Sequence, residues 1–103
     1  MINLEVAQFA QQVTSQNVVV LDVRTPEEFA QGRIPNSINI DVLEPNFIAE
    51  IAHLDKTLEY AVYCRSGKRS VDAAMAMDEI GFSTMNLIGG IIAWQESNQA
   101  IVP

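Results

Sequence analysis

At residues 63–70 the chain reads Tyr63-Cys64-Arg65-Ser66-Gly67-Lys68-Arg69-Ser70, and this segment indicates both the fold and the site. A short apolar run precedes it and an apolar segment with helical spacing follows it, so we predict a strand, a tight loop and a helix. The segment holds the only cysteine and three of the six basic residues. Such a loop places a thiol among backbone N–H groups at the positive end of a helix, where it ionises readily and attracts anions.

Length and composition limit the number of domains and the classes of partner. The chain has 103 residues, of which 49% are hydrophobic and 18% charged, so we expect one globular domain over residues 1–103. The formal net charge of −7 argues against nucleic acid and anionic membranes as partners. No apolar stretch approaches the roughly 20 residues of a membrane span, and no signal peptide opens the chain. We therefore expect a cytoplasmic protein, or a periplasmic one if a leader was removed.

Strand and helix signals alternate on both sides of the segment. The run Val18–Leu21 is apolar on both faces, which is typical of a buried parallel strand. Thr25, Pro26 and Glu28 form the strongest helix-start signal, a capping box with proline at the first helical position. The sequence also predicts strands at 38–40 and 84–88, and helices at 6–13, 47–51, 71–80 and 91–94, with Phe47, Ile48 and Ile51 facing inward in the second of these. This alternation predicts a three-layer α/β/α domain with a mostly parallel sheet of about five strands.

Cys64 would lie at the carboxyl end of a strand, where parallel α/β sheets bind ligands. A lone cysteine is most often a small buried hydrophobe. Its neighbours favour a functional thiol, because Arg65, Lys68 and Arg69 concentrate positive charge in an acidic chain and Gly67 lets the backbone approach a ligand. Two classes of substrate fit a thiolate in an anion-binding loop. One is a sulfur donor such as thiosulfate, and the other is a phosphate ester or an oxyanion such as arsenate.

Four fragments, in order and suitably spaced, resemble the motifs of single-domain rhodaneses, a family of sulfurtransferases. They are Asp22-Val23-Arg24 with Glu28-Phe29 and Gly32, the segment Gly32–Ile40, the loop Cys64–Ser70, and Gly89-Gly90 with Trp94. Arg33, Asn36 and Ser37 depart from the commonest family residues, but all three lie outside the loop. The resemblance covers Val18 to Trp94, which is most of the chain.

The resemblance implies a double displacement in which Cys64 takes sulfane sulfur from thiosulfate or a related small anionic donor and holds it as a persulfide. Arg65, Ser66, Gly67, Lys68 and Arg69 would bind the donor and stabilise the transferred sulfur. The acceptor would be cyanide, a thiol or a protein. The family pattern implies no cofactor, and we expect no metal, since a lone cysteine and a lone histidine cannot form a zinc site.

Two other functions remain open from the sequence. An oxyanion enzyme, either a phosphatase or an arsenate reductase, could use the same fold. Related phosphatases carry a histidine before the cysteine and a loop one residue longer, whereas here Tyr63 precedes Cys64 and four residues separate it from Arg69. A binding or sulfur-relay module for a partner protein is the third possibility.

Residues around the loop have structural interpretations. We expect Ser70 to cap the helix that follows the loop. We expect Asp22 and Arg24 to form a structural hydrogen bond or ion pair, and Trp94 to anchor packing.

Overall fold

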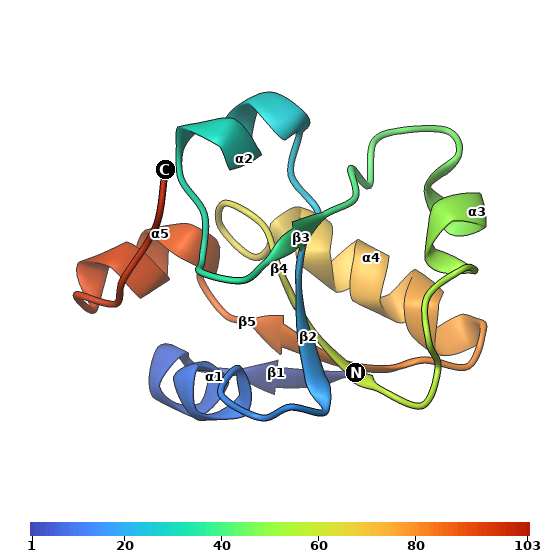
Figure 1. The fold of residues 1–103 in the computed structure, drawn as a ribbon, viewed down its shortest axis with the longest axis horizontal. Helices are drawn as coiled ribbons and strands as arrows, with labels where there is room; N and C mark the ends of the chain where they lie inside the picture. The colour runs from blue at the N-terminus through green and yellow to red at the C-terminus, as the bar shows by residue number, and fades with distance from the viewer.

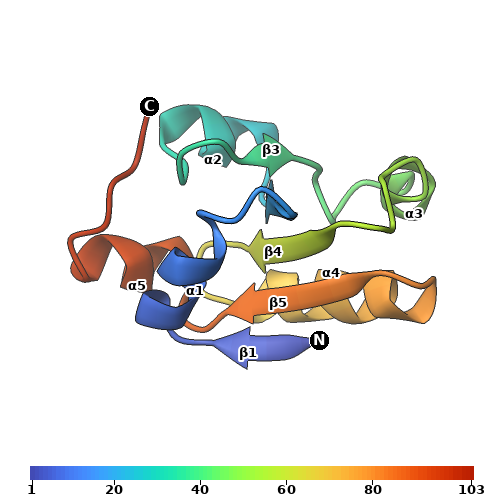
Figure 2. The same ribbon diagram turned by 60° about the horizontal axis from the view of Figure 1, so that its bottom comes forward.

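Five parallel strands form one sheet in the computed structural model, which describes all 103 residues. Their order across the sheet is β1 (Ile2–Leu4), β5 (Ser83–Leu87), β4 (Glu59–Tyr63), β2 (Val18–Asp22) and β3 (Ile38–Asn39). The helices are α1 (Val6–Gln12), α2 (Pro26–Gln31), α3 (Phe47–Ile51), α4 (Lys68–Glu79) and α5 (Gly90–Glu96). Figure 2 shows β1, β5 and β4 pointing the same way, toward α5. The predicted α/β architecture and the parallel five-stranded sheet are confirmed.

The sheet separates two apolar cores. Successive residues of β4 alternate between them, because side chains along a strand point to opposite faces. Tyr60 and Val62 pack with residues of α3 and α4, while Ala61 and Tyr63 pack on the other face. Trp94 is buried on that second face, edge-on to Phe9 of α1, as expected of a packing anchor. Figure 1 shows α1 and α5 to the left of β2 and β4, and α3 and α4 to the right.

The helix boundaries follow local chemistry. The Thr25 hydroxyl accepts a hydrogen bond from the Glu28 amide, and the Glu28 carboxylate accepts one from the Thr25 amide, which is the predicted capping box. In α3 the prediction was wrong for Ile48, which is 48% exposed. Phe47 and Ile51 lie four residues apart and share the buried face, whereas Ile48 lies about 100° further round the helix.

Helix α4 begins at Lys68, three residues before the predicted start, so Lys68 and Arg69 belong to its first turn. It is the longest helix, with 12 residues, and none of the five is long and apolar enough to cross a membrane.

Candidate active site

The loop between β4 and α4 lies at the carboxyl end of the middle strand. β4 ends at Tyr63, Cys64 follows directly, and Gly67 is the N-cap of α4. Gly67 has φ of 96°, in the left-handed region that favours glycine. A Cβ there would also lie 3.2 Å from the Leu87 carbonyl oxygen and from the Gly89 amide nitrogen. The sharp turn and the close packing behind it both explain glycine at this position.

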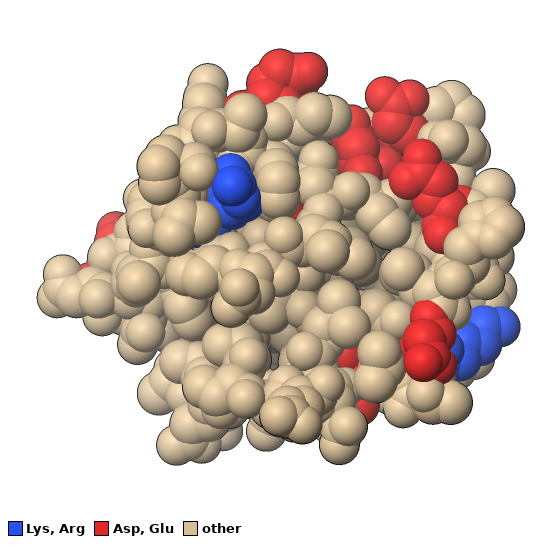
Figure 3. Space-filling view, viewed as in Figure 1, with Lys and Arg blue, Asp and Glu red and all other residues tan.

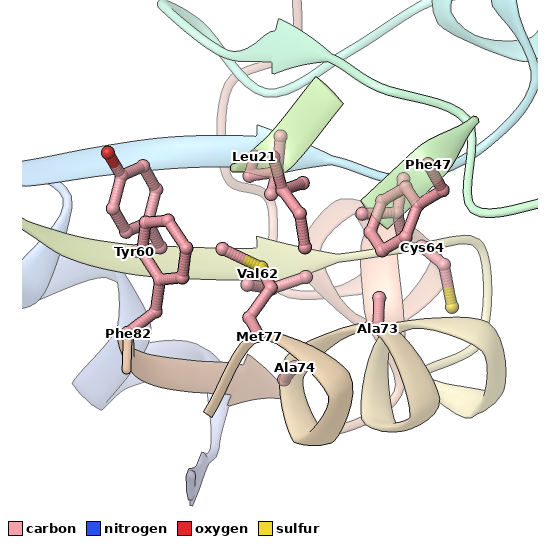
Figure 4. Close-up of a cluster of buried hydrophobic side chains, with 11 residues drawn as sticks. Leu21, Phe47, Tyr60, Val62, Cys64, Ala73, Ala74, Met77 and Phe82 are labelled. Carbon is pink, nitrogen blue, oxygen red and sulfur yellow. The ribbon is translucent and has the colours of Figure 1, made fainter. Parts of the chain in front are cut away.

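The Cys64 side chain is enclosed by hydrogen-bond donors of its own loop. The residue is 1% exposed, and its Sγ accepts hydrogen bonds from the Gly67 amide at 3.1 Å and from the Ser70 hydroxyl at 3.3 Å. Figure 4 shows it at one end of the apolar cluster, with the sulfur turned toward the start of α4. The thiol is therefore covered by apolar groups on one side and by polar donors on the other.

Burial alone would raise the pKa of the Cys64 thiol, because it penalises the charged form. Hydrogen bonds from the Ser70 hydroxyl and from the amides of Ser70, Gly67 and Ser66 act in the opposite direction and together lower the pKa below its ordinary value. The net effect favours a thiolate, the nucleophilic form of cysteine. An inert buried cysteine would show the reverse shift.

The start of α5 fixes the first two carbonyls of the loop. The amides of Ile91 and Ile92 donate to the carbonyls of Cys64 and Arg65, at 3.0 and 3.1 Å. The Ser66 amide shares a planar peptide group with the Arg65 carbonyl, so it points the other way, toward the thiol. A Cβ on Gly90 would lie 2.4 Å from the Arg65 carbonyl oxygen, so this close contact requires glycine.

The cationic residues of the loop occupy different environments. Arg65 and Lys68 are exposed and take part in no ion pair. Arg69 donates two hydrogen bonds to the Glu28 carboxylate of α2, at 2.8 and 3.0 Å. The hydrogen bonds of Arg69 are the chief reason that the pKa of Glu28 falls to about 2. Donor binding by Arg69 stays a prediction, and the donor would have to compete with Glu28.

Ser70 was missed as a site residue. It was expected to cap α4, but Gly67 occupies that position and Ser70 lies in the first turn, fully buried, with its hydroxyl on the thiol. Side chains in a helix point back toward its N-terminus. A hydroxyl in the first turn after a cysteine loop was therefore a signal that could have suggested this contact.

A buried ion pair fixes the end of the neighbouring strand. Arg24 and Asp22 are joined by hydrogen bonds of 2.7–3.1 Å, and the Asn39 amide donates to the carbonyls of both residues. Burial opposes the charge of Arg24, but the hydrogen bonds and charge of Asp22 outweigh it and raise its pKa. The predicted structural role of this pair is confirmed.

Charge is unevenly distributed around the loop. Figure 3 shows acidic side chains gathered over α3 and the segment leading to it, while lysine or arginine atoms surface in a hollow below α2. No group of three or more histidine, cysteine, aspartate or glutamate side chains is arranged to hold a metal ion. The arrangement supplies a nucleophilic sulfur with amide donors and nearby positive charge, which suits attack on a small anion.

Comparison with known proteins agrees with this geometry. The sequence model of the rhodanese-like domain family matches residues 5–97 of this chain. A putative sulfurtransferase of Bacillus subtilis is 40% identical over 83 residues, which cover 78% of this chain and 76% of that protein. A sulfurtransferase of Allochromatium vinosum is 39% identical over 90 residues, covering 85% of this chain and 81% of that one. The crystal structure of a rhodanese-related protein from Thermoplasma volcanium superposes with a TM-score of 0.89 at 30% identity, covering 99% of this chain and 98% of that chain.

Proposed function

Because the chain belongs to the family of rhodanese-like domains, we propose that it is a sulfurtransferase that carries sulfur on Cys64 as a persulfide. The observation that carries the proposal is the set of hydrogen bonds from the loop and from Ser70 to the Cys64 sulfur. The named sulfurtransferases among its relatives support the reaction class. Thiosulfate, or a donor of similar size and charge, is the proposed source of sulfur.

In the first half-reaction, the Cys64 thiolate attacks the outer sulfur of thiosulfate. A sulfur–sulfur bond forms to Cys64 while the sulfur–sulfur bond within thiosulfate breaks, and its electron pair leaves with sulfite. The three negative charges of the reactants reappear as one on the persulfide and two on sulfite, so no oxidant or reductant is needed. This is the same displacement at sulfur that occurs in thiol–disulfide exchange.

In the second half-reaction, an acceptor attacks the outer sulfur of the persulfide. Cyanide would leave as thiocyanate, and a thiolate would leave as a new persulfide. In either case the bond to Cys64 breaks, and its electron pair restores the thiolate. Each cycle returns the protein to its starting state, which is consistent with catalysis without a cofactor.

The loop has two tasks in this scheme. Its amides stabilise negative charge on Cys64 and on the outer sulfur as it arrives, in the manner of an oxyanion hole. Lys68, exposed and in no ion pair, attracts the donor's anionic end. Arg65 and Ser66 are also exposed beside the thiol, and Gly67 supplies an amide, while Arg69 is held by Glu28.

Intact-mass measurement tests the proposal. Incubation with thiosulfate should add one sulfur atom to the protein, and cyanide should remove it with release of thiocyanate. Cys64→Ser should do neither, and its circular dichroism spectrum should stay that of the wild type. Full turnover by Cys64→Ser would contradict the assignment of the nucleophile. Release of phosphate from an aryl phosphate, without any sulfur adduct, would favour an oxyanion enzyme instead.

A further inference from the structure

A cleft of about 320 Å³ opens beside the loop, between α2, the start of α5 and the last residues of the chain. It shares Arg65 with the loop, and it shares Glu28 with the ion pair that holds Arg69. Its volume lies at the lower end of the range for small-molecule sites, roughly 300–1,000 Å³. A cleft of this size, bordered by the residue that follows the proposed nucleophile, suits the body of a small substrate.

Of the charged side chains that line the cleft, one has no oppositely charged partner. Arg24 is paired with Asp22 and Glu28 is paired with Arg69, so these two pairs are neutral. Arg65 takes part in no ion pair and lines the same cleft. The cleft is therefore cationic in a protein whose formal net charge is −7.

A second cation, Arg24, presents a donor to the cleft. Arg24 is 5% exposed, lines the cleft, and uses only its Nε and Nη2 for the hydrogen bonds to Asp22 and Gly32. Its Nη1 has no acceptor within the protein, and it is not fully buried, so a bound molecule can reach it. The cleft thus offers a free donor from Arg24 together with the charge of Arg65.

The remaining wall is apolar with amides at its edge. Ile91 and Ile92 of α5 form one side and Ile101 closes it near the C-terminus, while Gln31 and Gln95 contribute side-chain amides. Ile101 is held there because Val102 pairs with Arg33 through two backbone hydrogen bonds of 2.8 and 2.9 Å. Such a wall fits the short carbon chain and amide groups of an organic molecule better than it fits a bare inorganic anion.

We propose that this cleft binds the sulfur acceptor, and that the acceptor is a small thiol bearing a carboxylate and an amide. Arg65 and the free Nη1 of Arg24 bind the carboxylate, and the isoleucines contact the carbon chain. The inference rests on the proposed sulfurtransferase function. The acceptor's thiolate attacks the outer sulfur of the Cys64 persulfide, one sulfur–sulfur bond forms as the other breaks, and the electron pair returns to Cys64.

The test uses protein preloaded with sulfur from thiosulfate. Loss of the persulfide is followed by intact mass with N-acetylcysteine and with N-acetylcysteine amide, which differ only in the carboxylate, and rates are expressed per concentration of thiolate. Wild-type protein should react about fivefold faster with the carboxylate form, as expected of a partly exposed charged contact. Equal rates for the two thiols would overturn the proposal.

Two variants locate the effect. Arg65→Met should abolish the preference for the carboxylate form, and Ile101→Asp, at a position already 37% exposed, should reverse it by adding negative charge to the cleft. Lys56→Met removes an equal charge from an exposed residue that lies outside both the cleft and the Cys64 loop, and it should leave the ratio of the two rates unchanged. A preference that survives in Arg65→Met but disappears in Lys56→Met would place the carboxylate elsewhere and overturn the assignment.

The same experiment separates the two proposals. If the protein forms no persulfide, or if cyanide releases no thiocyanate from it, the sulfurtransferase function itself fails. If cyanide discharges the persulfide normally but the two thiols react equally, only the assignment of the cleft fails.

Discussion

Two strand-to-helix junctions lie side by side at the carboxyl edge of the sheet, and they use their helix starts differently. At the β2–α2 junction, the Thr25 hydroxyl accepts the free amide of Glu28, so side chains complete the helix start. At the β4–α4 junction, Gly67 caps the helix without a side-chain hydrogen bond, and its amide donates to the Cys64 sulfur. The first junction uses a free N–H group for stability, while the second directs one to the Cys64 sulfur, the proposed reacting atom.

The two junctions are also joined. Arg69 of α4 and Glu28 of α2 form a two-point ion pair, so the structural junction supports the chemical one. The amides of a helix start can serve either a cap or an anion. The direction in which these amides point therefore distinguishes a loop suited to an anion from a structural turn.

Gly67→Ala should give the largest effect among variants that keep the cysteine. The change forces alanine into φ of 96° and brings its Cβ to 3.2 Å from backbone atoms of Leu87 and Gly89. We expect a loss of about 1–3 kcal/mol of stability from backbone strain. We also expect turnover to fall about a hundredfold, because a shift of about 1 Å at a reacting group can cost that much.

The rate of sulfur transfer from thiosulfate to cyanide measures the effect on turnover, and urea unfolding measures the effect on stability. If Gly67→Ala folds normally and turns over at the wild-type rate, the amide of residue 67 does not have the role assigned to it.

Ser70→Ala should slow persulfide formation about tenfold at pH values below the pKa of Cys64, the loss expected if the hydrogen bond to the thiolate is worth about 1.4 kcal/mol. The hydroxyl lowers the pKa of Cys64, so its loss should raise that pKa and reduce the thiolate fraction at low pH. Well above both pKa values the two proteins should react at similar rates. The pH profile of persulfide formation measures the shift, and a uniform loss of rate at every pH would argue for a purely steric role.

Lys68→Ala should raise the KM for thiosulfate about threefold at low salt, and Arg69→Ala should raise it less. Lys68 is unpaired, whereas the charge of Arg69 is already balanced by Glu28. The difference should shrink at high salt, because screening weakens exposed charges. Steady-state kinetics at two ionic strengths checks this, and a larger effect from Arg69 would mean that the donor displaces Glu28.

Thr25→Ala should have the smallest effect on turnover, although it should lower the stability of the fold. Losing an N-cap hydroxyl typically costs about 1 kcal/mol, which corresponds to a fall in Tm of about 4–8 °C in a domain of about this size. Turnover per folded molecule should stay within about twofold of wild type, because this cap makes no contact with the thiol. A differential scanning calorimetry trace paired with a turnover assay compares the two quantities. A loss of activity as large as that of Gly67→Ala would mean that the two junctions do not have separate roles.

The sequence predicted those parts of the molecule that depend on neighbours along the chain. Short-range signals dominate locally at the capping box of Thr25, at the parallel strand predicted over Val18–Leu21 and observed over Val18–Asp22, and at the loop after Tyr63. Ile48 was misplaced because a helix of five residues is too short for its apolar spacing to define one buried face.

The features that could not be predicted depend on residues far apart in the sequence. The partner of Arg69 lies 41 positions away in α2, and nothing near Arg69 indicates Glu28. The contact of Gly90 with the Arg65 carbonyl likewise arises only when α5 packs behind the loop. Family resemblance located the motifs but did not show that the cationic side chains of the loop differ in their availability to a donor.

The central claim is that hydrogen-bond donors of the loop and of Ser70 hold the Cys64 sulfur as a thiolate despite its burial. Since the chain has one cysteine, a pH titration of thiolate ultraviolet absorbance in the folded protein reports on that sulfur alone. The account predicts a midpoint below the value of about 8.5 for an ordinary cysteine. A midpoint at or above that value would show that burial outweighs the donors, and would contradict the account.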